Sequence, residues 1–292
     1  MIYKKNISIA SIGILLTSDI PILLSERCKG FEVQEDCQDV VMRVHIDGNS
    51  ERFELEDARN ILDEDTFAIY ENEDGIFKVQ YESEKKESIH WIAYADASCR
   101  KYEIYYREER DCLEGINPLQ YVVLSEFLIH HNAVILHSSL IDVGGKGIVF
   151  TAPSQVGKST QANLWEQYRY AEILNGDRAI IRKQVEGYIA YGSPFAGSSA
   201  IYKNRSTQLE TIVVLKQAEE NRVRKMGAKE AFLNLLSQIS LLQGSKNSVD
   251  AHMEWLLQWM EQVPVYLLEC RPDEEAVSVL WNKIEEEKHE RK

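Results

Sequence analysis

The sequence predicts an α/β (α+β) protein in which a smaller β-rich domain, residues 1–117, precedes a second domain, residues 118–292, built on a mixed, largely antiparallel sheet. Short runs of partly alternating apolar and polar residues fill the first half of the chain, which is typical of strands. In the second half, two pairs of such runs are joined by short glycine-containing turns, which favour antiparallel hairpins. Between these hairpins an apolar run leads through a Gly-Lys-Ser loop into a helical pattern.

Size, charge and cysteine content limit the classes of function. A chain of 292 residues has room for one large or two ordinary domains. Its formal net charge of −14 leaves no basic face for a phosphate backbone, so we expect no nucleic-acid partner. The apolar stretch from Ile7 to Leu16 is too short to span a bilayer and favours a buried first strand over an export signal, so we expect no membrane partner. Five scattered cysteines favour reduced thiols and the cytoplasm.

The first half is a succession of expected strands without recognisable chemistry. We expect them at residues 7–12, 20–24, 31–33, 40–46, 66–70, 75–79, 90–94 and 101–106, with turns at 29–30, 47–49 and 72–75. At Pro118 the spacing of apolar residues becomes helical and stays so to Asn132. We therefore expect a helix over 118–132 and a domain boundary at its start.

The second half alternates between strands and helices. We expect hairpins of 134–143 with 147–150 and of 179–182 with 188–191, strands at 209–215 and 263–269, and helices from 158, over 228–242, over 249–262 and from 272. A parallel neighbour would need a crossover of a dozen or more residues, so the short turns make these pairs antiparallel.

The loop between the hairpins matches a phosphate-binding pattern in its second half. The Walker A pattern G-x-x-x-x-G-K-[ST] needs backbone N–H groups turned onto a phosphate, a lysine for the β and γ phosphates, and a hydroxyl for Mg²⁺. Gly157, Lys158 and Ser159 supply its end, whereas Ala152 replaces the first glycine and is tolerable where φ stays negative. A chance Gly-Lys-Ser is the alternative. The expected nucleotide-binding residues are Ala152, Pro153, Ser154, Gln155, Val156, Gly157, Lys158, Ser159 and Thr160.

Three residues are candidates for catalysis of phosphoryl transfer, which requires a metal, a carboxylate and cations around a nucleotide. Asp177 begins the strand after the loop helix and is the expected carboxylate and metal ligand, together with Ser159; a turn-capping aspartate is the alternative. His137 lies on the strand that pairs with the one leading to the loop, and the sequence leaves open which face it takes. Lys158 completes the catalytic set.

Substrate contacts are expected from a loop of small residues at a strand end and from two arginines. Small residues let a substrate backbone approach closely, although an ordinary connector would look the same. The expected substrate residues are Gly192, Ser193, Gly197, Ser198, Arg178 and Arg205.

The run from Leu136 to Val143, the turn Gly145-Lys146-Gly147 and the loop ending in Gly157-Lys158-Ser159 resemble the catalytic domain of the HPr kinase/phosphorylase family. The resemblance covers about residues 134–286 and implies a P-loop fold of the type shared with phosphoenolpyruvate carboxykinase, with ATP and Mg²⁺ as cofactors. It also implies that Lys158 and Ser159 bind phosphate and metal, that His137 assists near the γ-phosphate, and that Asp177 acts at the metal or the acceptor. Residues 152–154, 174–178, 192–195 and 265–269 are similar to a bacterial subgroup in which some members phosphorylate a serine of a lasso-peptide precursor and others free serine.

One position departs from the family pattern. The acidic pair of the family aligns with Gly176 and Asp177, so one of its two carboxylates is absent. The signature for dephosphorylation is not evident, so we expect no phosphorylase activity. The sequence thus predicts an ATP-dependent kinase that transfers the γ-phosphoryl group to a hydroxyl, with Ser of a peptide or small protein as the acceptor. A nucleotide-binding pseudokinase or peptide-binding module and a small-molecule kinase acting on free serine are alternatives, and a homo-oligomeric state stays open.

Overall fold

A computed structural model of the chain describes residues 1–46, 55, 57–86, 88–108 and 110–290, and the expected turn at 47–49 lies outside these residues. The chain forms two compact units, Met1–His131 with Leu242–Val249 and Asn132–Leu241 with Asp250–Lys292. The first unit therefore extends beyond the boundary expected after residue 117. It does so because helix α2 (Leu124–His130) packs on the strands of this unit, where Phe127 lies 6.4 Å from Tyr102 between ring centroids.

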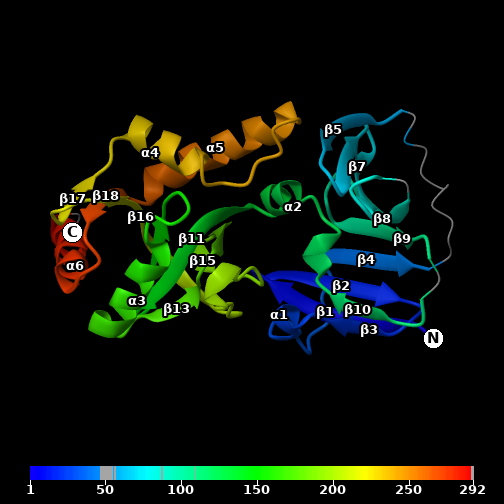
Figure 1. Ribbon diagram of the computed structural model, residues 1–292, viewed down its shortest axis with the longest axis horizontal. Helices are drawn as coiled ribbons and strands as arrows, with labels where there is room; N and C mark the ends of the chain where they lie inside the picture. Colours follow the sequence, from blue (N-terminus) through cyan, green and yellow to red (C-terminus); the bar gives the residue numbers. More distant parts are fainter. Residues whose placement is uncertain (47–54, 56, 87, 109, 291–292) are drawn as a thin grey trace. The chain divides into compact units, whose positions relative to one another are not determined.

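One eight-stranded sheet forms the body of the first unit (Figure 1). Its strand order is β1–β2–β4–β9–β8–β7–β6–β5, in which β2–β4 and β4–β9 are parallel. The strands are β1 (Tyr3–Ile9), β2 (Ile12–Ser18), β4 (Val40–His45), β5 (Arg59–Asp63), β6 (Phe67–Glu71), β7 (Gly75–Tyr81), β8 (Ile89–Asp96) and β9 (Lys101–Tyr106). Ile12, Ile14 and Leu16 of β2 are all fully buried, as the two-residue period of a half-buried strand requires.

The expected strands at 40–46, 66–70, 75–79, 90–94 and 101–106 are confirmed to within two residues at their ends, but other expectations for this unit were wrong. The segment 7–12 contains a turn at Ala10 and Ser11, whose φ angles are 53° and 57°, and not one continuous strand. Residues 31–33 form only an isolated bridge at Glu32. Strand β5 and strand β10 (Leu113–Ile116), which pairs with β3 (Ile22–Leu24), were missed. The helix expected over 118–132 is a short 3-10 turn at Pro118–Gln120 followed by α2.

The second unit contains the mixed sheet that the sequence predicts. Hairpins β11–β12 and β14–β15 are antiparallel, and the first turns at Gly144 and Gly145 with φ of 60° and 84°. In contrast, β12–β16 and β16–β18 are parallel. The strands are β11 (Ala133–Val143), β12 (Lys146–Thr151), β13 (Glu172–Asn175), β14 (Arg178–Gln184), β15 (Gly187–Tyr191), β16 (Ser206–Gln217), β17 (Arg222–Lys225) and β18 (Val265–Cys270). The helices are α3 (Lys158–Arg169), α4 (Ala228–Leu236), α5 (Lys246–Gln262), of which 250–262 belong to this unit, and α6 (Glu274–Glu290).

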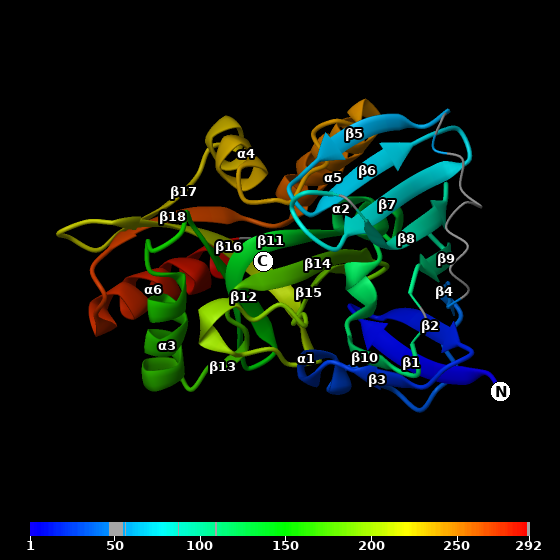
Figure 2. The ribbon, with the colours of Figure 1, turned by 45° about the vertical axis from the view of Figure 1, so that its right-hand side comes forward.

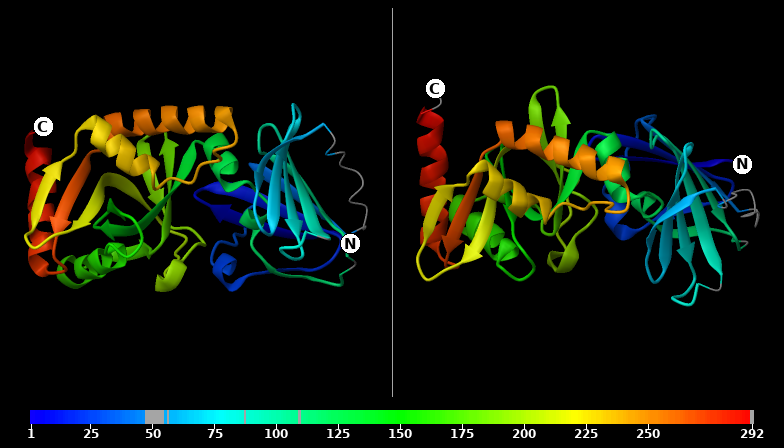
Figure 3. Two further views of the ribbon diagram at one scale, coloured as in Figure 1. Left: turned by 45° about the horizontal axis from the view of Figure 1, so that its top comes forward. Right: turned by 90° about the horizontal axis from the view of Figure 1, so that it is seen from above.

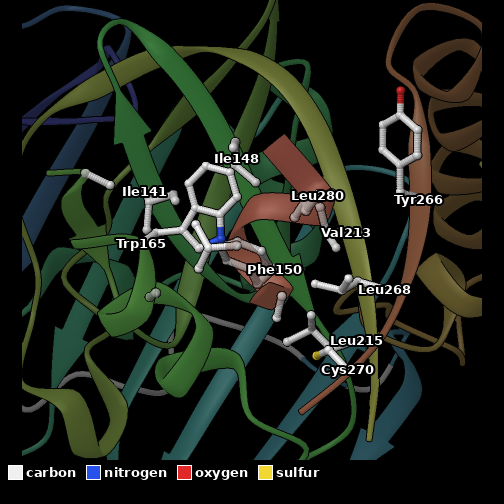
Figure 4. Packing of buried hydrophobic residues seen from close by; sticks show 14 of the residues in the cluster. Ile141, Ile148, Phe150, Trp165, Val213, Leu215, Tyr266, Leu268, Cys270 and Leu280 are labelled. Atoms are coloured by element: carbon white, nitrogen blue, oxygen red, sulfur yellow. The ribbon is translucent and has the colours of Figure 1, made fainter. Parts of the chain in front are cut away.

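Helices α3 and α6 cover one side of this sheet (Figure 2). Trp165 of α3 is fully buried against Phe150 of β12, with ring centroids 6.1 Å apart, and Figure 4 shows its indole among Ile141, Ile148 and Phe150. Leu280 of α6 joins the same cluster. Because Trp165 lies two turns into α3, this packing holds the first turn of the helix at the end of β12.

Helix α4 and residues 250–262 lie on the opposite side of the sheet (Figures 2 and 3), where Tyr188 of β15 contacts Trp255 with ring centroids 5.4 Å apart. The helix expected over 228–242 ends at Leu236, because Ile239 instead bridges to Leu136 of β11. Among the described residues no helix is both long and apolar enough to cross a membrane. All five cysteines are free thiols.

Candidate active site

The loop from Ala152 to Gly157 joins β12 to α3 at the carboxyl end of β12. Gly157 has φ 122°, a conformation that side chains rarely allow, although a Cβ at this position would meet nothing within 4 Å. Gln155 also has positive φ at 66°, whereas Ala152 keeps a negative φ. No side chain caps the first turn of α3, so its backbone amides and partial positive charge remain for an anion. Ser159 and Thr160 are exposed at this turn.

The Lys158 side chain folds back into this loop. Its Nζ donates to the carbonyl oxygens of Ala152 at 2.9 Å and Pro153 at 3.3 Å, which uses two of its three N–H donors. Only 8% of the residue is exposed, and burial lowers the pKa of its ammonium, an effect that the nearby Asp177 carboxylate opposes. The loop thus holds a cation that has one donor left for a ligand oxygen.

His137 and Asp177 lie next to this cation. Strand β11 pairs with β14 so that His137 stands opposite Arg178, and Asp177 immediately precedes it. His137 Nε2 lies 3.6 Å from Asp177 Oδ1, and Arg178 Nε lies 3.5 Å from Asp177 Oδ2. Burial lowers the pKa of His137, the positive charge of Lys158 lowers it further, and Asp177 opposes both. The structure therefore places the three expected catalytic residues in one electrostatically coupled cluster.

Asn175, which the sequence analysis did not single out, fixes the turn that carries Asp177. Its Oδ1 accepts from the backbone N–H groups of Asp177 at 3.0 Å and Arg178 at 2.7 Å. Its Nδ2 donates to the carbonyl oxygens of Ser193 at 3.1 Å and Phe195 at 2.9 Å. The side chain is fully buried. The signal for this role was the turn-forming Asn-Gly-Asp sequence, in which an asparagine bonds to the backbone two residues on.

The loop expected to contact substrate, residues 192–199, packs against Asp177. A Cβ at Gly197, whose φ is 52°, would lie 2.7 Å from Asp177 Cγ, so only glycine lets the two segments approach this closely. Ser193 is fully buried and its Oγ donates to Arg178 O at 2.5 Å. The Arg178 guanidinium lies 5.7 Å from the centroid of the Phe195 ring.

Two other residues expected to contact substrate, Gly192 and Arg205, have structural roles instead. A Cβ at Gly192 would lie 2.0 Å from Lys203 O, so this glycine permits a close backbone approach within the protein itself. Arg205 donates from Nη1 to Glu172 Oε2 at 2.5 Å, and the structure does not bring it into the cluster. The Ser198 side chain lies outside the described part of the chain.

Packing leaves no room for a side chain at position 176. A Cβ at Gly176 would lie 1.9 Å from Oγ and 2.5 Å from Cβ of Ser199. Ser199 is held there because its Oγ donates to Ala196 O at 2.8 Å. A side chain at position 176 therefore fits only if Ser199 moves.

The described residues hold no group of three or more His, Cys, Asp or Glu side chains arranged for a metal ion. Mg²⁺ at phosphates, however, is commonly bound through one or two protein oxygens, with the remaining positions taken by phosphate and water. The Asp177 carboxylate, 28% exposed, and the exposed Ser159 hydroxyl are oxygen donors of the kind that this mode requires.

Comparisons with known proteins give no family assignment. No protein-family description and no curated protein matches the chain. Among solved structures, the chain is similar to the Hpr(Ser) kinase/phosphatase from Coxiella burnetii with a TM-score of 0.33 and 10% sequence identity, over 53% of this chain and 98% of that one.

Proposed function

We propose that the second unit is an ATP-dependent kinase of the HPr kinase-like type that transfers the γ-phosphoryl group to a hydroxyl, with Ser of a peptide or small protein as the acceptor. The observation that supports this proposal is the cluster of Lys158, His137 and Asp177 beside a loop with uncapped helix amides. Phosphoryl transfer is catalysed largely by positioning and by charge around the phosphates, and these groups supply both.

Each residue has a role that follows from its surroundings. The loop amides and Lys158 bind the β and γ phosphates, and Asp177 and Ser159 would hold Mg²⁺, which would neutralise phosphate charge. The acceptor oxygen bonds to the γ phosphorus as the bond to the β–γ bridging oxygen breaks. His137 takes the proton of the hydroxyl, because burial and the charge of Lys158 lower its pKa and so favour the neutral imidazole, which can accept a proton, while Asp177 binds the metal.

The test is transfer of label from γ-labelled ATP, with Mg²⁺, to free serine, HPr protein and short Ser-containing peptides. We expect label on a peptide or protein acceptor and a loss of at least about 10²-fold in Lys158→Ala and in Asp177→Asn. Lys183→Ala is the matched control, since Lys183 is an exposed lysine of β14 that bonds to Gln258. Nucleotide affinity that is unchanged in Lys158→Ala would refute the role of the loop.

A second candidate function rests on Gly176. Because Ser199 occupies the space of a side chain at this position, the site has one carboxylate where the resembling family has two. This favours a nucleotide-binding pseudokinase or peptide-binding module, for which we expect tight ATP binding without transfer or hydrolysis. Label on free serine alone would instead identify a small-molecule kinase.

A further inference from the structure

A pocket of about 470 Å³ adjoins the loop on the side away from His137. Strand β12 lies between β11, which carries His137, and β16, so the two neighbours flank the loop. The pocket is lined by Pro153 and Val156 of the loop, by the last residues of β16 and by residues of β17, β18 and α4. Its volume lies within the range of small-molecule sites.

The strand directions place this pocket where a sheet of this kind binds ligands. Strands β12, β16 and β18 are mutually parallel, so their carboxyl ends meet at one edge. Gln217, the last residue of β16, donates from Nε2 to the Val156 carbonyl oxygen at 3.3 Å. The wall of the pocket is therefore joined directly to the loop that would hold phosphates.

The lining of the pocket fits a flat neutral ligand better than an anion. Its cations are already paired: Lys216 with Glu269 at 2.7 Å, and Arg224 with Glu230 through two bonds of 2.8 and 2.6 Å. The apolar residues of the lining are Pro153, Val156, Val214, Leu215, Met226 and Leu267.

Asn234 of α4 adds a polar group to this lining. Its Nδ2 donates to the Glu230 carbonyl oxygen at 2.9 Å, and its Oδ1 accepts no hydrogen bond from the described residues. An amide oxygen in a lining that also contains apolar residues can accept from a heteroaromatic ring that carries an N–H donor, such as the amino group of adenine.

We propose that this pocket binds the adenosine part of ATP, an inference that rests on the proposed binding of phosphates at the loop. The nucleotide then crosses the loop from one side to the other, with the base beside β16 and β18 and the γ-phosphate toward His137 and Asp177. The acceptor hydroxyl is thereby assigned to the side of β11 and β14, where the loop 192–199 lies against Asp177.

The test compares ATP with inorganic tripolyphosphate, which has the phosphates and lacks the nucleoside, by calorimetric titration. Asn234→Trp fills the pocket, and Leu233→Trp is the matched control, because Leu233 is the adjacent residue of α4 but is 57% exposed and outside the lining. We expect Asn234→Trp to weaken ATP binding by about 10- to 100-fold and to leave tripolyphosphate binding unchanged. Leu233→Trp should bind both like the wild type.

The wild-type protein gives a second measurement that needs no substitution. We expect it to bind ATP at least about tenfold more tightly than tripolyphosphate. Equal affinities, or wild-type ATP affinity in Asn234→Trp, would overturn the assignment of the pocket while the loop function stands. If neither ligand binds the wild type, the proposed phosphate-binding function itself fails, and the pocket assignment fails with it.

Discussion

Replacing Gly176 with alanine probes the packing of Ser199 against this position. The new Cβ would lie 1.9 Å from Ser199 Oγ and 2.5 Å from Ser199 Cβ. Carbon atoms pack at about 3.5–4.0 Å, so Ser199 has to shift by roughly 1 Å or more. That shift breaks the bond from Ser199 Oγ to Ala196 O, which is 2.8 Å long.

The change in the free energy of unfolding is the sum of two destabilising effects and one stabilising effect. Overpacking costs about 1–3 kcal/mol and the lost hydrogen bond about 1 kcal/mol. Replacing glycine reduces the conformational freedom of the unfolded chain, which stabilises the folded protein by about 0.4–1 kcal/mol. We expect the free energy of unfolding of Gly176→Ala to fall by about 1–3.5 kcal/mol, measured by urea denaturation of the whole chain.

A second substitution identifies the cause. Ser199→Gly removes both atoms that the new Cβ would meet, so the double variant should lose about 1–2 kcal/mol less than the two single variants together. The reasoning is refuted if Gly176→Ala unfolds within about 0.5 kcal/mol of the wild type, or if its cost is the same with Ser199→Gly present.

Three further changes have distinct expected results. Asn175→Ala removes the acceptor for the amides of Asp177 and Arg178. It should lower the transfer rate about tenfold or more, while calorimetry finds ATP affinity nearly unchanged. An equal loss of transfer rate and ATP affinity would point to general unfolding. Arg205→Ala breaks only an exposed pair with Glu172, so transfer should stay within about twofold and stability within about 1 kcal/mol in paired activity and denaturation assays. Lys78→Met concerns the first unit, where Lys78 Nζ donates to Gln120 O at 2.8 Å and burial lowers its pKa from 10.5 to about 8. Between these two pH values the unfolded chain binds one proton more than the folded chain at this group. The free energy of unfolding of the wild type should therefore rise by about 2 kcal/mol as pH rises from about 7 to about 9.5. Denaturation of Lys78→Met at both pH values should find this rise absent.

The hairpins could be predicted because their information is local. Gly144 and Gly145 allow the positive φ of a two-residue turn, and the flanking apolar runs supply the strands. The turn at Ala10 and Ser11 has the same geometry without a residue that signals it. The parallel pairing of β12 with β16 joins residues about sixty positions apart, and no spacing in the sequence encodes such a partner.

The residues of the candidate site also fall into those that a local sequence signal predicts and those that depend on contacts made by the fold. Lys158 stands out because its loop is one contiguous motif, and the Asn-Gly-Asp turn marks Asp177. Ser199 was missed because its effect depends on a contact with Gly176, twenty-three positions earlier, that only the folded loop creates. Arg205 was selected for its charge alone, although its guanidinium bonds to Glu172 on a neighbouring strand.

Strand register is what brings the three reactive groups together. Thr151, the last residue of β12, pairs with Ser138, so His137 lies one residue beyond the end of β12, where the loop begins. The Thr151 hydroxyl donates to His137 O at 2.9 Å and holds this register. His137 in turn pairs with Arg178, which places Asp177 beside it. A slip of one residue between β11 and β12 would turn His137 to the other face of the sheet, so the chemistry of the site depends on hairpin pairing that the two-glycine turn fixes.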